Sequence, residues 1–154
     1  MNSAQLQCVL SNDRVSRHHA TLVCASDQLP SRMVTYPYGM IVNTQESSRP
    51  GKHWVSIWIQ SDQKSEFFDS FGLGPSTYGF DTFLQRVSKR YSYNGEVLQS
   101  ANSDTCGLYA LFYILLKVRD YQMSDILNYF SKDDTLMNDL FLYRFALNYF
   151  NQCL

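Results

Sequence analysis

The chain has 154 residues, of which 45% are hydrophobic and 15% are aromatic. This length and composition predict one folded domain with a sizeable core and exclude a disordered chain. The net charge of −1 gives no overall attraction to nucleic acid or to an anionic membrane surface.

Cysteine usage and hydropathy narrow the class of protein further. The four cysteines (Cys8, Cys24, Cys106 and Cys153) contain no CxxC pair, so a zinc ribbon or redox motif is not indicated and we expect no metal or cofactor. The N-terminus lacks the pattern of a secretory signal, and no apolar run reaches the roughly 18 residues that span a bilayer. We therefore expect an intracellular protein, neither secreted nor in a membrane, with reduced thiols.

The first half of the chain predicts a helix and then strands. Residues 3–10 favour a short helix, and residues 21–25 and 38–43 favour short strands. In the run HWVSIWIQ (53–60), apolar residues point to both faces, which is typical of a central strand. One face carries Val55, Ile57 and Ile59, and the other carries Trp54 and Trp58. After the turn SDQK, the run SEFFDSF predicts a second strand, so residues 53–69 form a hairpin.

The second half predicts mainly helices. Apolar residues at helical spacing indicate an amphipathic helix, namely Phe80, Phe83, Leu84, Val87 and Tyr91. We expect a short strand at 96–98, a helix at 108–118 that is buried on most sides, and a helix at 124–130. An apolar stripe marks a final helix, namely Leu136, Leu140, Tyr143, Leu147 and Phe150. The predicted fold is α+β, a central mostly antiparallel sheet packed with helices.

Cys106 stands where a polar loop meets the buried helix. Asp104 or Thr105 would cap this helix and place the thiol in its first turn, where the helix dipole and free N–H groups favour a thiolate. Gly107 would leave room for a substrate backbone. A lone cysteine is more often a small buried hydrophobe, so the local sequence leaves both interpretations open.

A cysteine nucleophile needs a base and a group that orients the base. His53 opens the central strand, whereas His18 and His19 lie in a polar, basic stretch that favours a surface position. Asp69 ends the partner strand, so the hairpin brings it to the same rim as His53, where Trp54 could wall the site. Gln99 could donate a side-chain N–H to the oxyanion that develops during acyl transfer.

The order His53, Asp69, Gln99, Cys106 resembles the adenain clan of cysteine proteases, which holds the adenovirus maturation protease and the SUMO-specific proteases. The segments HW, FFDSFG and QSANSDTCGLY are similar to motifs of that clan, and the gap of seven from glutamine to cysteine is similar to the adenoviral form. DQLP and IVNT, ahead of HW, are also adenain-like. The resemblance covers about residues 20–115.

The resemblance implies an adenain-like fold, in which residues 1–154 form a single cysteine protease domain with the nucleophile at the N-terminus of a buried central helix. It implies that His53 is the general base, Asp69 its orienting group, Gln99 the oxyanion donor and Cys106 the nucleophile. Substrates would be capsid or other structural precursor proteins of a virus or a Polinton-type transposon, cut near glycines in a virion or host cell, with Trp54 and Gly107 contacting the substrate.

This sequence differs from the adenain clan in ways that limit which properties of the clan we expect in this chain. The adenoviral enzyme is activated by a disulfide-linked peptide and by DNA, but this chain has Ser88 near the position of that cysteine and is not basic. The sequence therefore does not support either activator, and neither is carried over. We expect a monomer. Two alternatives remain open: a protease that removes ubiquitin or a ubiquitin-like modifier, and an inactive module of the same fold that binds a glycine-rich tail.

Overall fold

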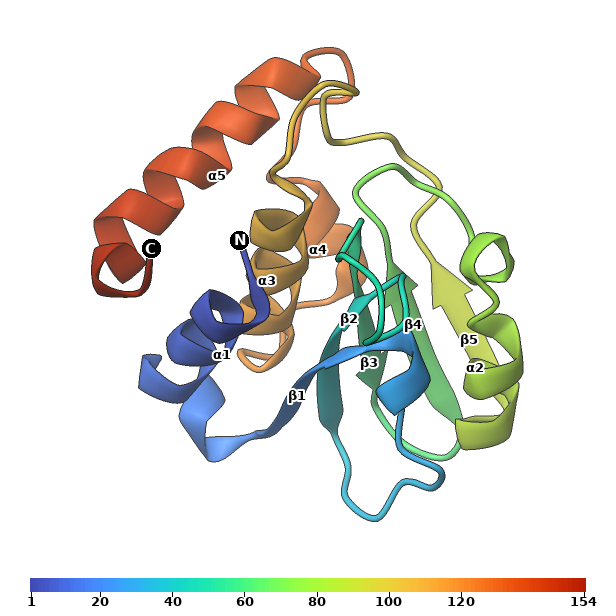
Figure 1. Cartoon of the computed structure of the whole chain (residues 1–154). Helices are drawn as coiled ribbons and strands as arrows, with labels where there is room; N and C mark the ends of the chain where they lie inside the picture. Colours follow the sequence, from blue (N-terminus) through green and yellow to red (C-terminus); the bar gives the residue numbers. More distant parts are fainter.

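Five strands form one sheet in the order β1-β2-β3-β4-β5, as the computed structural model of residues 1–154 shows (Figure 1). The strands are β1 (Ala20–Ala25), β2 (Tyr38–Asn43), β3 (Trp54–Ile59), β4 (Lys64–Phe68) and β5 (Arg90–Tyr93). The inner pairs β2–β3 and β3–β4 are antiparallel, and the edge pairs β1–β2 and β4–β5 are parallel. The α+β class is confirmed. The sheet is mixed because both edge strands are reached by long connections, which allow parallel pairing.

Helices lie on both faces of this sheet (Figure 1). The α-helices are α1 (Ser3–Asn12), α2 (Asp81–Val87), α3 (Cys106–Lys117), α4 (Met123–Leu127) and α5 (Thr135–Phe150). Short 3-10 helices occupy Ser16–His18, Ser26–Gln28, Pro75–Tyr78 and Asn151–Cys153. α2 covers one face, while α1, α3, α4 and α5 lie on the other. None of the helices has the length and apolar character needed to cross a bilayer.

Each face of the sheet has its own hydrophobic core. One core joins Ile41, Trp58 and Phe68 to the helices α1, α3, α4 and α5. The other joins Val55, Ile57 and Ile59, with further side chains of the sheet, to α2. β3 thus buries both faces, as its alternation predicts, and it lies in the middle of the sheet. Helix α3 is almost wholly buried against it, which fixes the position of its first residue, Cys106.

The segment after α2 differs from the prediction. The helix ends at Val87, and Tyr91 lies in β5, because Tyr91 pairs with Ser65 of β4. Tyr91 lies four residues after Val87, a spacing that suits a helical stripe but also fits the two-residue period of a strand. No strand forms at 96–98. The N–H of Leu98 bonds to a turn carbonyl, and its carbonyl accepts side-chain N–H and O–H groups instead of a ladder partner.

The apolar stripe predicted for the last helix is mostly exposed. Leu136, Leu140, Tyr143 and Leu147 are 48–62% exposed, and only Phe150 of the stripe is buried. α5 instead buries the side that carries Asn138, Asp139, Leu142 and Ala146. Apolar and aromatic residues lie all round this helix, so their spacing identifies a helix without deciding which face packs inward.

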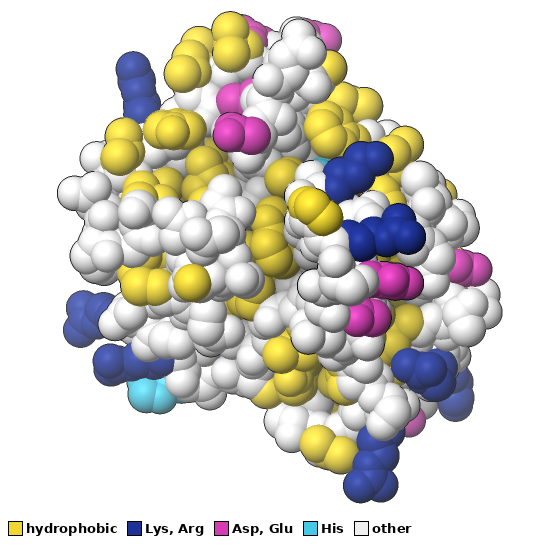
Figure 2. Space-filling model, in the orientation of Figure 1, with side chains coloured by type: hydrophobic (Ala, Val, Ile, Leu, Met, Phe, Trp, Pro, Cys, Tyr) yellow, Lys and Arg dark blue, Asp and Glu magenta, His cyan; other side chains and the backbone are white.

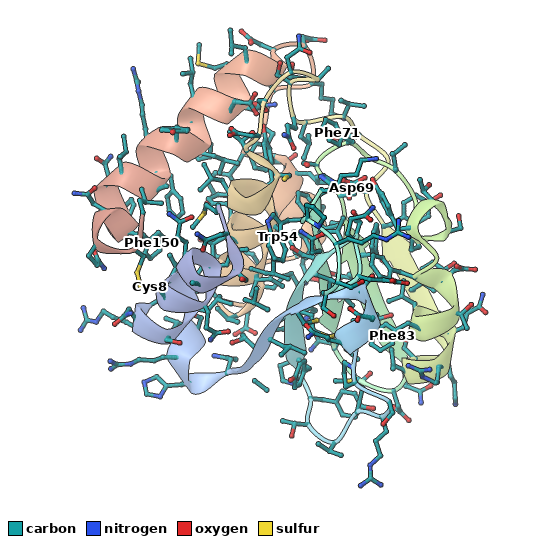
Figure 3. The ribbon with its side chains drawn as sticks, viewed as in Figure 1. Cys8, Trp54, Asp69, Phe71, Phe83 and Phe150 are labelled. Atoms are coloured by element: carbon teal, nitrogen blue, oxygen red, sulfur yellow. A yellow bond between two sulfur atoms is a disulfide. The ribbon has the colours of Figure 1, made fainter.

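The expectation that all thiols are reduced is wrong for two of the four cysteines. Cys8 and Cys153 form a disulfide across a sequence separation of 145 residues, with their Cα atoms 5.7 Å apart. The pairing arises because α1 packs beside the last residues of the chain, and in Figure 3 Cys8 lies close to Phe150. No sequence spacing reveals such a contact. Cys24 and Cys106 are free thiols.

Candidate active site

His53 and Asp69 meet at one end of the β3–β4 hairpin. His53 directly precedes β3 and Asp69 directly follows β4, and the pairing of Ser56 with Phe68 brings these ends together. Nε2 of His53 lies 2.6 Å from Oδ1 of Asp69, and their side chains are 9% and 0% exposed. Because Asp69 occupies Nε2, the ring nitrogen Nδ1 is left for a second partner.

The Asp69 carboxylate is held by donors on both oxygens. Besides the histidine, Oδ1 accepts the N–H of Phe71 at 3.1 Å, while Oδ2 accepts the N–H of Leu73 at 3.1 Å and the hydroxyl of Tyr78 at 3.0 Å. The Asn94 side chain bonds to both the N–H and the carbonyl of Asp69, at 2.9 and 2.7 Å. These contacts hold the carboxylate in one position, with Oδ1 at the ring nitrogen of His53.

Cys106 lies in the first turn of α3, where the sequence places it. Thr105 is the N-cap residue, but its hydroxyl makes no capping bond because it bonds to Asp139. Burial raises the pKa of the Cys106 thiol. Hydrogen bonds with the His53 side chain and with the backbone of Trp54 and Gly107, together with the charge of His53, outweigh burial and hold the pKa below its ordinary value.

The same contacts act on His53 in the opposite direction. Burial lowers the pKa of His53, but hydrogen bonds to Asp69 and Cys106 and the negative charges of both groups outweigh it and raise the pKa to about 9. The rings of Phe71 and Tyr78 lie beside the imidazole, with centroids 5.1 and 5.9 Å away. These opposite shifts favour transfer of the thiol proton from Cys106 to His53.

The turn after β4 also contacts the segment that carries Gln99. The carbonyl of Ser70 accepts the N–H groups of Leu98 and Gln99 at 2.8 and 3.1 Å. Gly72 has a positive φ of 68°, and a Cβ there would stand 2.7 Å from the carbonyl carbon of Glu96. Only glycine suits this turn, because other residues would be strained and would clash with the backbone.

The Gln99 side chain is buried, and its two ends have different partners. Its Oε1 accepts the Ser70 hydroxyl at 2.7 Å, and its Nε2 donates to the carbonyl and hydroxyl of Ser103 at 2.8 and 3.1 Å. Gln99, His53 and Cys106 line one cleft, so the structure brings the predicted residues together.

This cleft has a volume of about 760 Å³ and runs between the helices and the loop from β2 to β3. Figure 2 shows the hollow, with apolar side chains in its depth and charged groups on its rim. The charged residues of the loop are Glu46, Arg49 and Lys52. In Figure 3, Asp69 and Phe71 lie above Trp54, beside the upper end of α3.

Trp54 lines the cleft, whereas Gly107 is buried behind it and the space beside Gly107 is filled. A Cβ on Gly107 would stand 3.2 Å from Cβ of Met1 and 3.4 Å from Cδ1 of Trp54. The indole N–H of Trp54 donates to the carbonyl of Met1 at 3.0 Å. The missing side chain of Gly107 therefore accommodates Met1 and Trp54 in this structure, where the sequence suggested room for a substrate.

Sequence reasoning missed several residues that support the site. Tyr78 and Asn94 hold Asp69, and Asp139 bonds to Thr105 beside the thiol. In the sequence, the segment that contains Tyr78 indicates only a break in the sheet. The asparagine-glycine pair at 94–95 indicates only a turn. No group of three His, Cys, Asp or Glu side chains is arranged to hold a metal ion.

Comparison with known proteins finds a similarity to a viral cysteine protease. No protein-family model matches the sequence. The chain is similar to a cysteine protease of African swine fever virus, with 31% identity over 125 residues that cover 73% of this chain and 43% of the viral protein. A crystal structure of the selenomethionine form of the African swine fever virus protease has a TM-score of 0.49 and 23% identity, covering 71% of this chain and 44% of that one. The chain thus spans less than half the length of the viral cysteine protease to which it is similar.

Proposed function

We propose that this chain is a cysteine endopeptidase of the adenain type, acting as a single domain on structural precursor proteins of a virus or a virus-like transposon. The observation that carries the proposal is that His53 contacts both Cys106 and the buried Asp69, and that His53, Cys106 and Gln99 line one cleft. Similarity to a viral cysteine protease supports the same chemistry.

In the proposed reaction, the Cys106 thiolate attacks the carbonyl carbon of the scissile peptide bond. The negative oxygen that forms is stabilised by the backbone N–H of Cys106 and by Nε2 of Gln99. Protonated His53 gives its proton to the leaving amine as the C–N bond breaks, which leaves a thioester on Cys106. Neutral His53 then takes a proton from water, the hydroxide attacks the thioester, and the acid product and the thiolate are released.

The packing beside Cys106 supports the proposed preference for small residues next to the cleaved bond. Trp54 and Met1, which line the cleft, pack against Gly107 next to Cys106. A glycine in the substrate would need the least displacement of these side chains. Ser88, which stands near the position of the activating cysteine in the adenoviral enzyme, is buried and bonds to Ser65 at 2.6 Å, so the proposal includes no linked peptide.

The decisive test is cleavage of structural precursors encoded beside this chain, measured against ubiquitin-like conjugates. We expect precursor cleavage by the wild type, none by Cys106→Ala or His53→Ala, and unchanged cleavage by His18→Ala, which alters an exposed histidine. Retained activity in Cys106→Ala would refute the nucleophile. Cleavage of conjugates alone would replace the proposal with the deconjugating function, and binding of glycine-rich tails without cleavage would favour the inactive module.

A further inference from the structure

Asp139, on the last helix, holds both ends of the loop that joins Gln99 to Cys106. This carboxylate is 5% exposed. Its Oδ1 accepts the hydroxyls of Thr105 and Tyr109, both at 2.9 Å, and its Oδ2 accepts the N–H of Ser100 at 3.3 Å. Ser100 directly follows Gln99, and Thr105 directly precedes Cys106, so one side chain of α5 fixes the loop next to both residues.

The proton of Thr105 sets the direction of a chain of hydrogen bonds. A hydroxyl carries a single proton, and Thr105 gives it to Asp139, so Thr105 can only accept from Ser103, whose oxygen is 2.9 Å away. Ser103 therefore donates to Thr105 and must accept from Gln99. The contact of 3.1 Å between Ser103 Oγ and Gln99 Nε2 has this direction.

This direction matters because an amide side chain can be turned either way. Flipped, Gln99 would present Oε1 to the loop and lose its bonds to the Ser103 carbonyl and hydroxyl. An oxyanion needs an N–H, and an amide oxygen in the same place would repel it. On the other side, the Ser70 hydroxyl donates to Oε1, in agreement with the same orientation.

We propose that Asp139 is a positioning residue that orients the Gln99 amide through Thr105 and Ser103, so that Nε2 and not Oε1 lies on the side of Ser103, which also lines the cleft. The proposal rests on the proposed protease function. It also explains why α5 buries polar residues over the loop while much of its apolar surface stays exposed: Asn138 binds the carbonyl of Leu98, and Asp139 holds the rest of the loop.

The kinetic test combines Asp139→Asn with Gln99→Ala. Asp139→Asn keeps the shape but removes the charge and adds a donor, so we expect kcat to fall about 10-fold, a fraction of the loss of a whole oxyanion donor, with KM within twofold. In the Gln99→Ala background the same change should cost less than twofold, because the amide it orients is gone. An equal loss in both backgrounds would overturn the proposal.

Glu66→Gln is the control, although Glu66, unlike Asp139, also pairs with Lys117 and Lys64. Glu66 is also a buried carboxylate that accepts the hydroxyl of an α3 tyrosine, here Tyr113 at 2.6 Å, but it has no contact with the loop. We expect it to change kcat less than twofold in either background. A loss equal to that of Asp139→Asn would mean that any buried carboxylate has this effect, and would refute a specific role. If Asp139→Asn fails to fold, Thr105→Val breaks the same chain one step nearer to Gln99 and should give the same pattern.

A second readout does not depend on activity. The side-chain NH₂ signals of Gln99, assigned in a nitrogen–proton NMR spectrum by their absence in Gln99→Ala, should move in Asp139→Asn and stay in place in Glu66→Gln. Unmoved signals in Asp139→Asn would refute the orienting role even if the chain cleaved nothing. An inactive wild type with the expected NMR shifts would refute the protease function alone.

Discussion

The hydroxyl of Ser70 donates a 2.7 Å hydrogen bond to Oε1 of Gln99, which lies 29 residues later in the chain. Ser70 directly follows Asp69, the residue that binds His53. Two consecutive residues after β4 therefore hold the proposed base and the proposed oxyanion donor. This arrangement lets one rigid turn set the distance between the two groups, which is what a preorganised site requires.

Gln99→Ala tests the oxyanion role directly. We expect kcat to fall by roughly 10² to 10³, the usual cost of one oxyanion donor, with little change in KM because the interaction forms mainly in the transition state. Steady-state kinetics on a cleaved precursor gives both constants. Gln85→Ala, on the exposed side of α2, is the control and should match the wild type. A change below twofold in Gln99→Ala would remove this residue from the mechanism.

Alkylation should distinguish the two free thiols. Burial, followed by the charge of Asp27, raises the pKa of Cys24 to about 11, whereas the pKa of Cys106 lies below its ordinary value. Iodoacetamide reacts with thiolates, so mass spectrometry at pH 6 to 7 should find Cys106 modified well before Cys24.

Accessibility alone could also produce that order, so His53→Ala is the control. The variant leaves Cys106 at least as exposed but removes its cationic partner, and labelling at pH 6 should slow about tenfold or more, since one pKa unit changes the thiolate fraction tenfold. Equal labelling rates in the two proteins would show that His53 does not activate the thiol.

The sequence predicted the positions of the proposed catalytic residues better than it predicted the residues that hold them in place. The alternation in HWVSIWIQ identified β3, and the hairpin it forms was enough to place His53 beside Asp69. The supports come from Tyr78 in a short 3-10 helix, from Asn94 directly after β5 and from Asp139 on the last helix. Local patterns do not reveal such contacts because tertiary packing decides them.

The last helix shows the same limit. Its apolar stripe indicated a helix correctly, but the buried side carries Asn138 and Asp139, since the loop before Cys106 supplies polar groups that need partners. The Cys8–Cys153 disulfide was missed for a related reason: the two ends of the chain meet only once the helices are packed.

The pH dependence should report the ion pair at the site. The pKa of His53 is raised to about 9, so kcat/KM should fall as the pH rises through about 9 and the imidazolium loses its proton. The pair with Asp69 also stabilises the fold. Because the folded pKa is raised, that contribution is complete below the ordinary histidine pKa of about 6.5 and is lost as the pH rises through about 9.

Asp69→Asn removes the charge that raises this pKa. The alkaline limb of kcat/KM should move to lower pH, and the loss of thermal stability on raising the pH should shift in the same direction. Glu66→Gln should leave the limb where it is. An alkaline limb at the same pH in wild type and Asp69→Asn would mean that it reports another group.

Tyr78→Phe tests whether the hydroxyl on Asp69 contributes to catalysis. The change removes one of the four hydrogen bonds to the carboxylate and keeps the ring beside His53. Burial and the Asp69 charge raise the pKa of Tyr78, so the hydroxyl stays protonated and donates at every working pH. We expect kcat to fall on the order of fivefold, equivalent to about 1 kcal/mol for one hydrogen bond, with KM unchanged.

The direction of the pH shift separates this role from a merely structural one. With one donor fewer, Asp69 interacts more strongly with the imidazolium, so the alkaline limb in Tyr78→Phe should move to higher pH, opposite to Asp69→Asn. Tyr91→Phe, in β5, is the control for loss of a tyrosine hydroxyl and should alter neither kcat nor the limb. A fall in kcat with an unmoved limb would mean that Tyr78 supports the fold of its loop and not the charge of the pair, because only a contact with the carboxylate changes how strongly His53 holds its proton.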